Sequence, residues 1–183
     1  RILPAAPGTG IVFVRTDIAD RDNEIPTLWD RVVDTRLCTA IANADGVRVA
    51  TIEHLMAALR GCHIDNARIE IDGPEVPIMD GSSAPFVAAI LAAGVRSQTA
   101  PRRMIRILRT IAVSEDGKRA SLSPGALPVF RGAIDFDHAT IGRQSHEMTL
   151  VNGHFVHGLS DARTFGFLHE VEWMRANGLG RGG

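Results

Sequence analysis

The sequence has few cysteines, no long hydrophobic run and no excess of charge of either sign. Its two cysteines, Cys38 and Cys62, are too few for a structural zinc knuckle, and without a secretion signal we expect reduced thiols. No stretch approaches the roughly 20 apolar residues of a transmembrane helix, and no basic segment precedes an apolar signal core. These absences predict a cytoplasmic protein without membrane spans.

The charge balance gives no sign of a protein that coats nucleic acid or an anionic membrane, so any polyanionic partner must be bound locally. The chain carries 20 basic and 21 acidic residues, for a formal net charge of −1. A protein that coats nucleic acid or an anionic membrane usually has a clear basic excess. We therefore expect no nucleic-acid partner. There is also no Gly-rich phosphate loop ending in Lys-Ser/Thr, which disfavours an unrelated α+β nucleotide-binding domain.

The 183 residues are 45% hydrophobic and 22% charged, which is typical of a soluble globular chain with a packed core. This length suits one large domain or two small ones. The sequence starts at Arg1 rather than Met and closes on Gly182-Gly183 after a helical pattern. We therefore expect an internal piece of a longer protein, cut at both ends.

Periodicity predicts strands grouped around helices. The expected strands are residues 11–16, 47–50, 67–71, 104–113, 118–122 and 129–137. The expected helices are residues 52–60, 84–93 and 168–176, each followed by a glycine or by Asn-Gly. Glu115-Asp116-Gly117-Lys118 predicts a hairpin turn. The hydroxyl of Thr51 could cap the first helix.

A polar stretch at 98–103 contains a proline and marks a candidate domain boundary. Because strict βαβ alternation is missing, we predict an α+β fold of two similar sandwich domains. The first domain is residues 1–100 and carries a Glu-His helix. The second is residues 101–183 and is expected to be incomplete.

The helix at 52–60 pairs a carboxylate with an imidazole in its first turn. Its expected core stripe is Ile52, Leu55, Met56 and Leu59. Glu53 and His54 fall on the other side, with Ala57 and Ala58, whose small side chains would leave space for a ligand or an approaching segment. Such a pair suits a site where the imidazole binds a metal and the carboxylate handles protons. An exposed Glu-His pair is also common on ordinary helices, and one histidine cannot hold zinc alone.

The wider context extends the pattern over nearly the whole chain. Asp34-Thr-Arg-Leu-Cys-Thr precedes Thr51-Ile-Glu-His-Leu-Met-Ala-Ala-Leu-Arg-Gly, which Ile64-Asp-Asn and Pro74-Glu-Val-Pro-Ile-Met-Asp-Gly-Ser follow. Ile134-Asp-Phe-Asp-His and Ala162-Arg-Thr-Phe-Gly-Phe come later. In content and order these motifs resemble the UDP-3-O-acyl-N-acetylglucosamine deacetylase family.

The resemblance implies a zinc-dependent hydrolase that removes the N-acetyl group from an acylated UDP-sugar in lipid A (lipopolysaccharide) biosynthesis. His54 matches a zinc ligand, Glu53 the general base and Thr164 the hydroxyl that stabilises the oxyanion. Further positions resemble parts of the substrate site: Leu37 and Cys38 near the sugar, and Phe165 and Phe167 flanking the sugar and the acyl start. The helix that contains Val171, with Leu179 and Gly180 after it, resembles the wall of the acyl passage. We expect a monomer.

Several residues have simpler interpretations. Cys38 can equally be a small buried hydrophobe. Asp80 before Gly81 is expected to form a turn rather than act in catalysis. His138, His154 and His157 invite a metal assignment that the resemblance does not support, and we expect His154 and His157 to be exposed loop residues.

The family's pattern also breaks in this sequence. Its Gly-rich opening strand, its later His-x-x-x-Asp ligand pair and its second catalytic histidine have no match here. One interpretation is a metallo-deacetylase seen in part, which would be inactive as a 183-residue piece. The alternative is a shortened non-catalytic paralogue that binds an acylated sugar nucleotide or a protein partner. Retention of Glu53, His54 and Thr164 together favours the enzyme.

Overall fold

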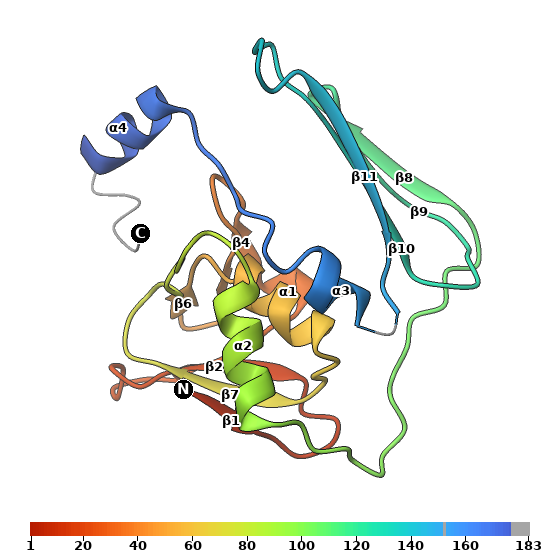
Figure 1. Ribbon diagram of the computed structural model, residues 1–183. Helices are drawn as coiled ribbons and strands as arrows, with labels where there is room; N and C mark the ends of the chain where they lie inside the picture. The colour runs from red at the N-terminus through yellow and green to blue at the C-terminus, as the bar shows by residue number, and fades with distance from the viewer. Residues whose placement is uncertain (152, 177–183) are drawn as a thin grey trace. The chain divides into compact units, whose positions relative to one another are not determined.

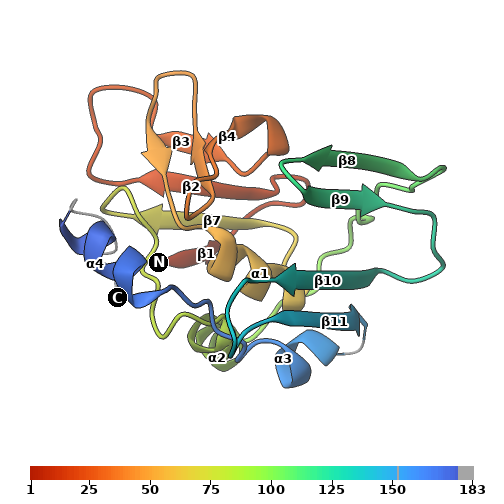
Figure 2. The same ribbon diagram turned by 90° about the horizontal axis from the view of Figure 1, so that it is seen from above.

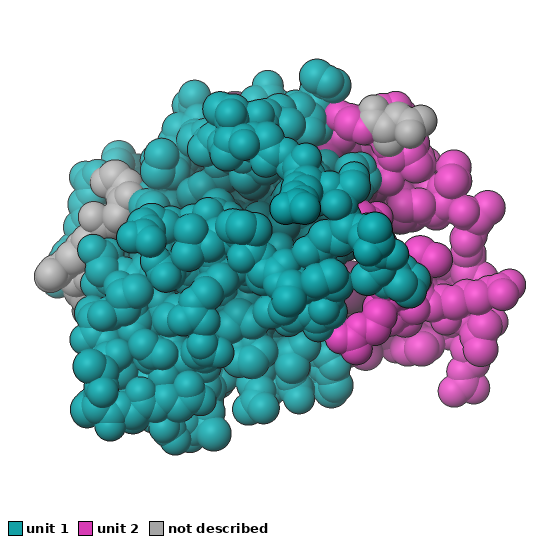
Figure 3. Space-filling model, turned by 90° about the horizontal axis from the view of Figure 1, so that it is seen from below, with its two compact units in different colours: residues 1–101, 156–183 teal, residues 102–155 magenta. Residues whose placement is uncertain are grey.

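The computed structural model describes residues 1–151 and 153–176 (Figure 1). The described chain forms two compact units, one of residues 1–101 and the stretch from Val156 onward, the other of Arg102–Phe155 (Figure 3). Helices and mainly antiparallel strands occur together, so the predicted α+β class is confirmed. The division into domains 1–100 and 101–183 stays a prediction.

The first unit is built on a four-stranded mixed sheet in the order β1-β7-β2-β3. Its strands are β1 (Ile2–Pro4), β7 (Ala67–Ile71), β2 (Ile11–Arg15) and β3 (Glu24–Pro26). β2 and β7 run parallel, with Phe13 opposite Ile69, and the outer strands pair antiparallel. Phe13 and Ile25 are fully buried. One face of this sheet therefore carries the core.

Two helices lie on that face of the sheet (Figures 1 and 2). α1 (Glu53–Gly61) and α2 (Ala84–Ala93) contact each other, and both match the predicted helices within one residue. Leu55 and Leu59 of α1 are buried as expected. Ala58 is fully buried as well, so the space expected beside its small side chain is filled by other parts of the chain and is not open to a ligand.

A second, three-stranded sheet in the same unit joins β4 (Val32–Asp34), β5 (Ala40–Ala42) and β6 (Arg48–Val49), after a short 3-10 helix at Trp29–Arg31. Arg15 connects the two sheets, because its guanidinium donates to the carbonyl of Arg48 at 2.8 Å. The same guanidinium forms a bidentate pair with Asp17, which raises the pKa of Arg15. β6 leads directly into α1.

The other unit consists of two hairpins. β8 (Ile111–Glu115) pairs with β9 (Lys118–Leu122), and β10 (Val129–Asp135) pairs with β11 (Arg143–Thr149). Asp116 and Gly117 have φ of 48° and 75°, which fits the predicted two-residue hairpin turn. The expected strand at 104–113 is only partly correct, since residues 104–110 are not in a strand.

Two short helices follow. α3 (His154–Gly158) contains both His154 and His157, so these residues are exposed as predicted but are helical rather than in a loop. α4 (Leu168–Ala176) matches its prediction. No helix within residues 1–151 and 153–176 has the length and apolar character needed to cross a membrane.

Candidate functional site

The Glu-His pair occupies the first turn of α1. The chain enters this helix through Thr51, whose backbone is left-handed with φ of 57°. The Thr51 hydroxyl does not cap the helix as predicted, because it donates to Glu75 Oε1 at 2.7 Å. Glu53 and His54 are both half-buried. An acidic residue in the first turn also interacts favourably with the helix dipole.

The Glu53 carboxylate is held by a loop from the three-stranded sheet. The backbone N–H of Thr39 donates to Glu53 Oε2 at 3.0 Å, and the N–H of Ile52 donates to the Thr39 carbonyl at 3.4 Å. Thr39 follows Leu37 and Cys38 directly. The loop that contains these two predicted substrate contacts therefore lies against the start of α1.

His54 is connected to the turn between β7 and α2. The hydroxyl of Ser83 donates to the backbone carbonyl of His54 at 2.9 Å. The Ser83 N–H donates in turn to the carbonyl of Ser160 at 2.9 Å. Ser83 and Ser160 are each 6% exposed, so these bonds form away from bulk water.

Asp80 organises this turn from within. Its Oδ1 accepts the Ser82 N–H at 3.0 Å and the Ser82 hydroxyl at 2.8 Å. The hydrogen bond from the Ser82 hydroxyl is the main reason that the pKa of Asp80 is lowered, and the positive charge of Arg163 adds to the effect. Ser82 Oγ also accepts the N–H of Ala84 at 3.1 Å, at the start of α2. Asp80 therefore has the turn-forming role expected of an aspartate before glycine.

Thr164 is attached to the same turn. Its N–H donates to the Gly81 carbonyl at 2.8 Å, and a Cβ placed on Gly81 would lie 3.6 Å from Thr164 Cγ2. Gly81 has φ of 81°, a conformation that glycine adopts without strain. The turn at 80–83 thus bonds to the first turn of α1 on one side and to the Thr164 segment on the other. The Thr164 side chain itself is exposed.

Three further candidate residues lie around the start of α4. Phe165 and Phe167 stack edge to face, with ring centroids 6.2 Å apart. The Phe167 N–H donates to the Glu170 carboxylate at 3.1 Å, which is the N3 half of a capping box. Val171 lies next to Gly166, because a Cβ built on Gly166 would be 3.4 Å from Val171 Cγ2. Leu179 and Gly180 lie outside the described residues.

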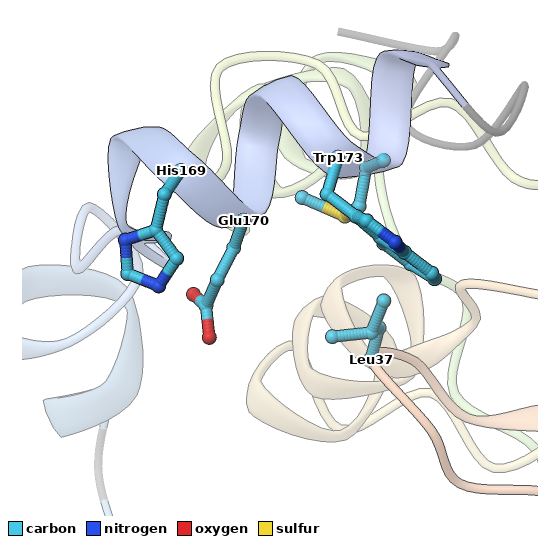
Figure 4. A pocket seen from close by; sticks show the side chains of 5 residues that line it. Leu37, His169, Glu170 and Trp173 are labelled. Carbon is cyan, nitrogen blue, oxygen red and sulfur yellow. The ribbon is translucent and has the colours of Figure 1, made fainter.

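Leu37 and α4 form a pocket of about 340 Å³ (Figure 4). Its lining consists of Leu37, His169, Glu170, Trp173 and Met174. The indole of Trp173 points towards Leu37, and His169 and Glu170 project from the same helix (Figure 4). The helix that contains Val171 was expected to line the acyl passage, but its lining residues His169, Glu170, Trp173 and Met174 were not named from the sequence. Trp173 was the available sign of this pocket, because it is a large aromatic residue on α4, a helix without buried residues.

The described residues meet the needs of zinc only in part. His54 offers an imidazole of the kind that zinc prefers, on a rigid helix turn beside a carboxylate. Nowhere in residues 1–151 and 153–176 do three or more His, Cys, Asp or Glu side chains form a group that could hold a metal ion. This stretch therefore offers one candidate ligand and not a complete site.

Comparison with known proteins supports one family. Residues 1–183 match the model of the family described as UDP-3-O-acyl N-acetylglycosamine deacetylase. The chain is 53% identical over 180 residues to the UDP-3-O-acyl-N-acetylglucosamine deacetylase of Myxococcus xanthus (strain DK1622), covering 98% of this chain and 57% of that protein.

Two further relatives carry the same name. The protein of Phenylobacterium zucineum (strain HLK1) is 50% identical over 182 residues, covering 100% of this chain and 62% of the relative. That of Shewanella halifaxensis (strain HAW-EB4) is 46% identical over 189 residues, covering 100% and 60%. The chain thus spans 57% to 62% of the length of these relatives.

Proposed function

Because the chain belongs to the UDP-3-O-acyl N-acetylglycosamine deacetylase family, we propose that it carries part of the active site of a cytoplasmic zinc-dependent deacetylase. Its substrate would be the UDP-3-O-acyl-N-acetylglucosamine for which the relatives are named, and its product would enter lipid A biosynthesis. His54 would hold the zinc ion together with ligands from the part of the relatives' length that these residues do not span.

One observation carries the proposal. The turn at 80–83 joins the helix turn of Glu53 and His54 to the segment of Thr164, through Ser83 Oγ to the His54 carbonyl at 2.9 Å and Thr164 N–H to the Gly81 carbonyl at 2.8 Å. The residues proposed as base, metal ligand and hydroxyl donor therefore belong to segments that this turn connects by hydrogen bonds. Amide hydrolysis needs these three functions close together.

Each residue would have a distinct role. When bound, zinc supplies a Lewis acid that favours deprotonation of water near neutral pH. Glu53, oriented by the Thr39 N–H, would accept the proton from the attacking water and return it to the departing amine. The Thr164 hydroxyl would donate to the developing oxyanion, and its exposed position leaves it accessible to substrate.

The pocket beside α4 suits the lipid part of such a substrate. Leu37, Trp173 and Met174 give it a largely apolar lining, and burying a methylene group stabilises binding by about 0.8 kcal/mol. Glu170 and His169 add polar groups on the same helix. We propose that this pocket, with Phe165, Phe167 and Val171, receives the start of the acyl chain, while Leu37 and Cys38 lie near the sugar.

A binding protein without turnover is the second candidate, and one experiment separates the two. A protein of the relatives' length containing these 183 residues would be incubated with the acylated UDP-sugar, and acetate release and bound zinc would be measured. The enzyme is expected to release acetate and to hold about one zinc ion. His54→Ala should lose both properties.

His63→Asn is the matched control, since this histidine lies beyond the end of α1, and asparagine tolerates its φ of 59°. This control should keep both zinc and turnover. Substrate binding without acetate release, in a protein that holds zinc, would instead support the non-catalytic alternative.

A further inference from the structure

Thr51 has an unusual backbone for its residue type. It has φ of 57°, and the other described non-glycine residues with positive φ, which are Leu37, His63, Met79 and Asp116, are not β-branched. A β-branched side chain in the left-handed region is a true outlier, and such strain persists only where the surroundings enforce it. Thr51 lies two residues before Glu53.

The segment after β7, residues 74–76, holds Thr51 in this left-handed conformation. The Thr51 hydroxyl donates to Glu75 Oε1 at 2.7 Å, and the Thr51 side chain is almost fully buried. On either side of this contact, the Ala50 N–H donates to the Pro74 carbonyl at 2.9 Å and the Val76 N–H donates to the Ala50 carbonyl at 3.0 Å. Residues 74–76 therefore hold the chain at Ala50 and Thr51 with three hydrogen bonds.

The held conformation determines where α1 starts. β6 ends at Val49 and α1 begins at Glu53, so only three residues turn the chain from strand to helix. On the opposite side, Thr39 bonds both to Ile52 and to the Glu53 carboxylate. A change in the backbone at Thr51 would rotate the first helical turn and move the Glu53 and His54 side chains together.

We infer that Thr51 and Glu75 form a positioning pair for the active site, in which the Thr51–Glu75 hydrogen bond fixes the left-handed turn that aims Glu53 and His54. Neither residue is placed here in contact with substrate or metal. The catalytic consequence rests on the function proposed above, whereas the geometric one does not. Catalytic groups tolerate only small displacements, so loss of this bond should affect turnover more than substrate binding.

The test uses a protein of the relatives' length with substitutions at Thr51. Thr51→Val keeps the β-branched shape and removes the hydroxyl, so kcat should fall about tenfold or more while KM changes by less than about twofold. Thr51→Ser keeps the hydroxyl and should restore kcat to within about threefold of the parent. A Thr51→Val variant with parental kcat, or a Thr51→Ser variant equally impaired, would overturn the inference.

Glu75 is exposed and provides the reciprocal test. Glu75→Gln keeps an acceptor oxygen and should retain most activity, whereas Glu75→Ala should match Thr51→Val. The double variant should be no worse than either single one, because both remove the same bond. Additive losses in kcat would show that the two residues act separately and would contradict the pairing.

A control separates positioning from loss of stability. Ile69→Val removes one methylene from the core of β7 and should lower Tm, yet leave kcat unchanged at temperatures well below Tm. Amide hydrogen exchange at Ile52 and Met56, whose N–H groups donate to the carbonyls of Thr39 and Ile52, gives a readout independent of activity. Exchange there should accelerate in Thr51→Val, return in Thr51→Ser and stay normal in Ile69→Val.

If the parent protein releases no acetate, the proposed function fails, and the exchange data still decide whether the pair holds the turn. Unchanged exchange in Thr51→Val would overturn the inference even in an active enzyme.

Discussion

The backbone N–H of Thr39 donates to the carboxylate of Glu53, with a distance of 3.0 Å between the nitrogen and Oε2. This bond orients one carboxylate oxygen towards the loop that contains Leu37 and Cys38. An amide at position 53 can accept the same bond through its carbonyl oxygen but is not a base. Glutamine at position 53 would therefore remove the base and keep the hydrogen bond from the Thr39 N–H.

Glu53→Gln in a protein of the relatives' length should lower turnover at least about 100-fold, because removal of a general base costs about 10² to 10⁴ in rate. Zinc content should stay near normal, since the proposed ligand on this helix is His54. Kinetics and metal analysis of the same preparation measure both. Loss of zinc together with activity would show that Glu53 is a ligand.

Thr164→Val should lower kcat by about 100-fold and leave KM nearly unchanged, because a lost oxyanion donor acts on the transition state. The fold should be retained, since the Thr164 segment is bonded to Gly81 through its backbone N–H. Thr164→Ser keeps the hydroxyl and serves as the matched variant. Equal activity of the valine and serine variants would remove Thr164 from the mechanism.

The 183-residue chain alone should bind zinc weakly and release no measurable acetate, because His54 would supply only one of the three protein ligands that a catalytic zinc normally has. Dialysis against trace zinc followed by metal analysis tests the first part, and an assay with the acylated UDP-sugar tests the second. Tight stoichiometric zinc with turnover would show that other residues, with His154 and His157 as first candidates, complete the site.

The free energy of unfolding should fall at low pH, because Asp80 becomes protonated. The Ser82 hydroxyl bond, then the Ser82 N–H bond, lower the pKa of Asp80 in the folded state. The stabilisation is therefore complete above the ordinary aspartate pKa of about 3.9 and is lost as pH falls through the lower folded value. Asp80→Asn cannot titrate, so its urea midpoint should change less between pH 6 and pH 3 than that of the parent. Equal changes in the urea midpoint of both proteins would show that Asp80 does not contribute to the loss of stability at low pH.

Local patterns predicted most of the longer elements, but they missed the seven-residue strand β11, whose sequence Arg-Gln-Ser-His-Glu-Met-Thr is almost entirely polar. α1, α2, α4, β7 and β9 each combine a clear period with a recognisable end, and the Asp116-Gly117 turn specifies its hairpin through two residues of positive φ. β1 and β3 were missed because each has three residues, including a proline, and depends on partners elsewhere in the chain. Residues 104–110 show the opposite error, since their apolar residues alone do not form a strand without a pairing partner.

In the candidate site, too, local features were predicted and long-range contacts were not. Glu53 and His54 could be found from the helix projection, because both lie within one local element. Thr164 was identified only through the family resemblance, since hydrogen bonds to Gly81 and between Ser83 and Ser160 join segments about 80 residues apart in sequence. The backbone bond from Thr39 and the contact between Thr51 and Glu75 leave no pattern in the sequence.

The unequal burial of the two free thiols provides a native chemical label. Cys62 is 9% exposed, and burial raises the pKa of its thiol, so little reactive thiolate forms near neutral pH. Cys38 is half-buried and precedes the residue whose N–H bonds to Glu53. A limiting amount of a maleimide fluorophore should therefore attach at Cys38 first. Its emission would report occupancy of the neighbouring loop by ligands in real time, without an introduced cysteine.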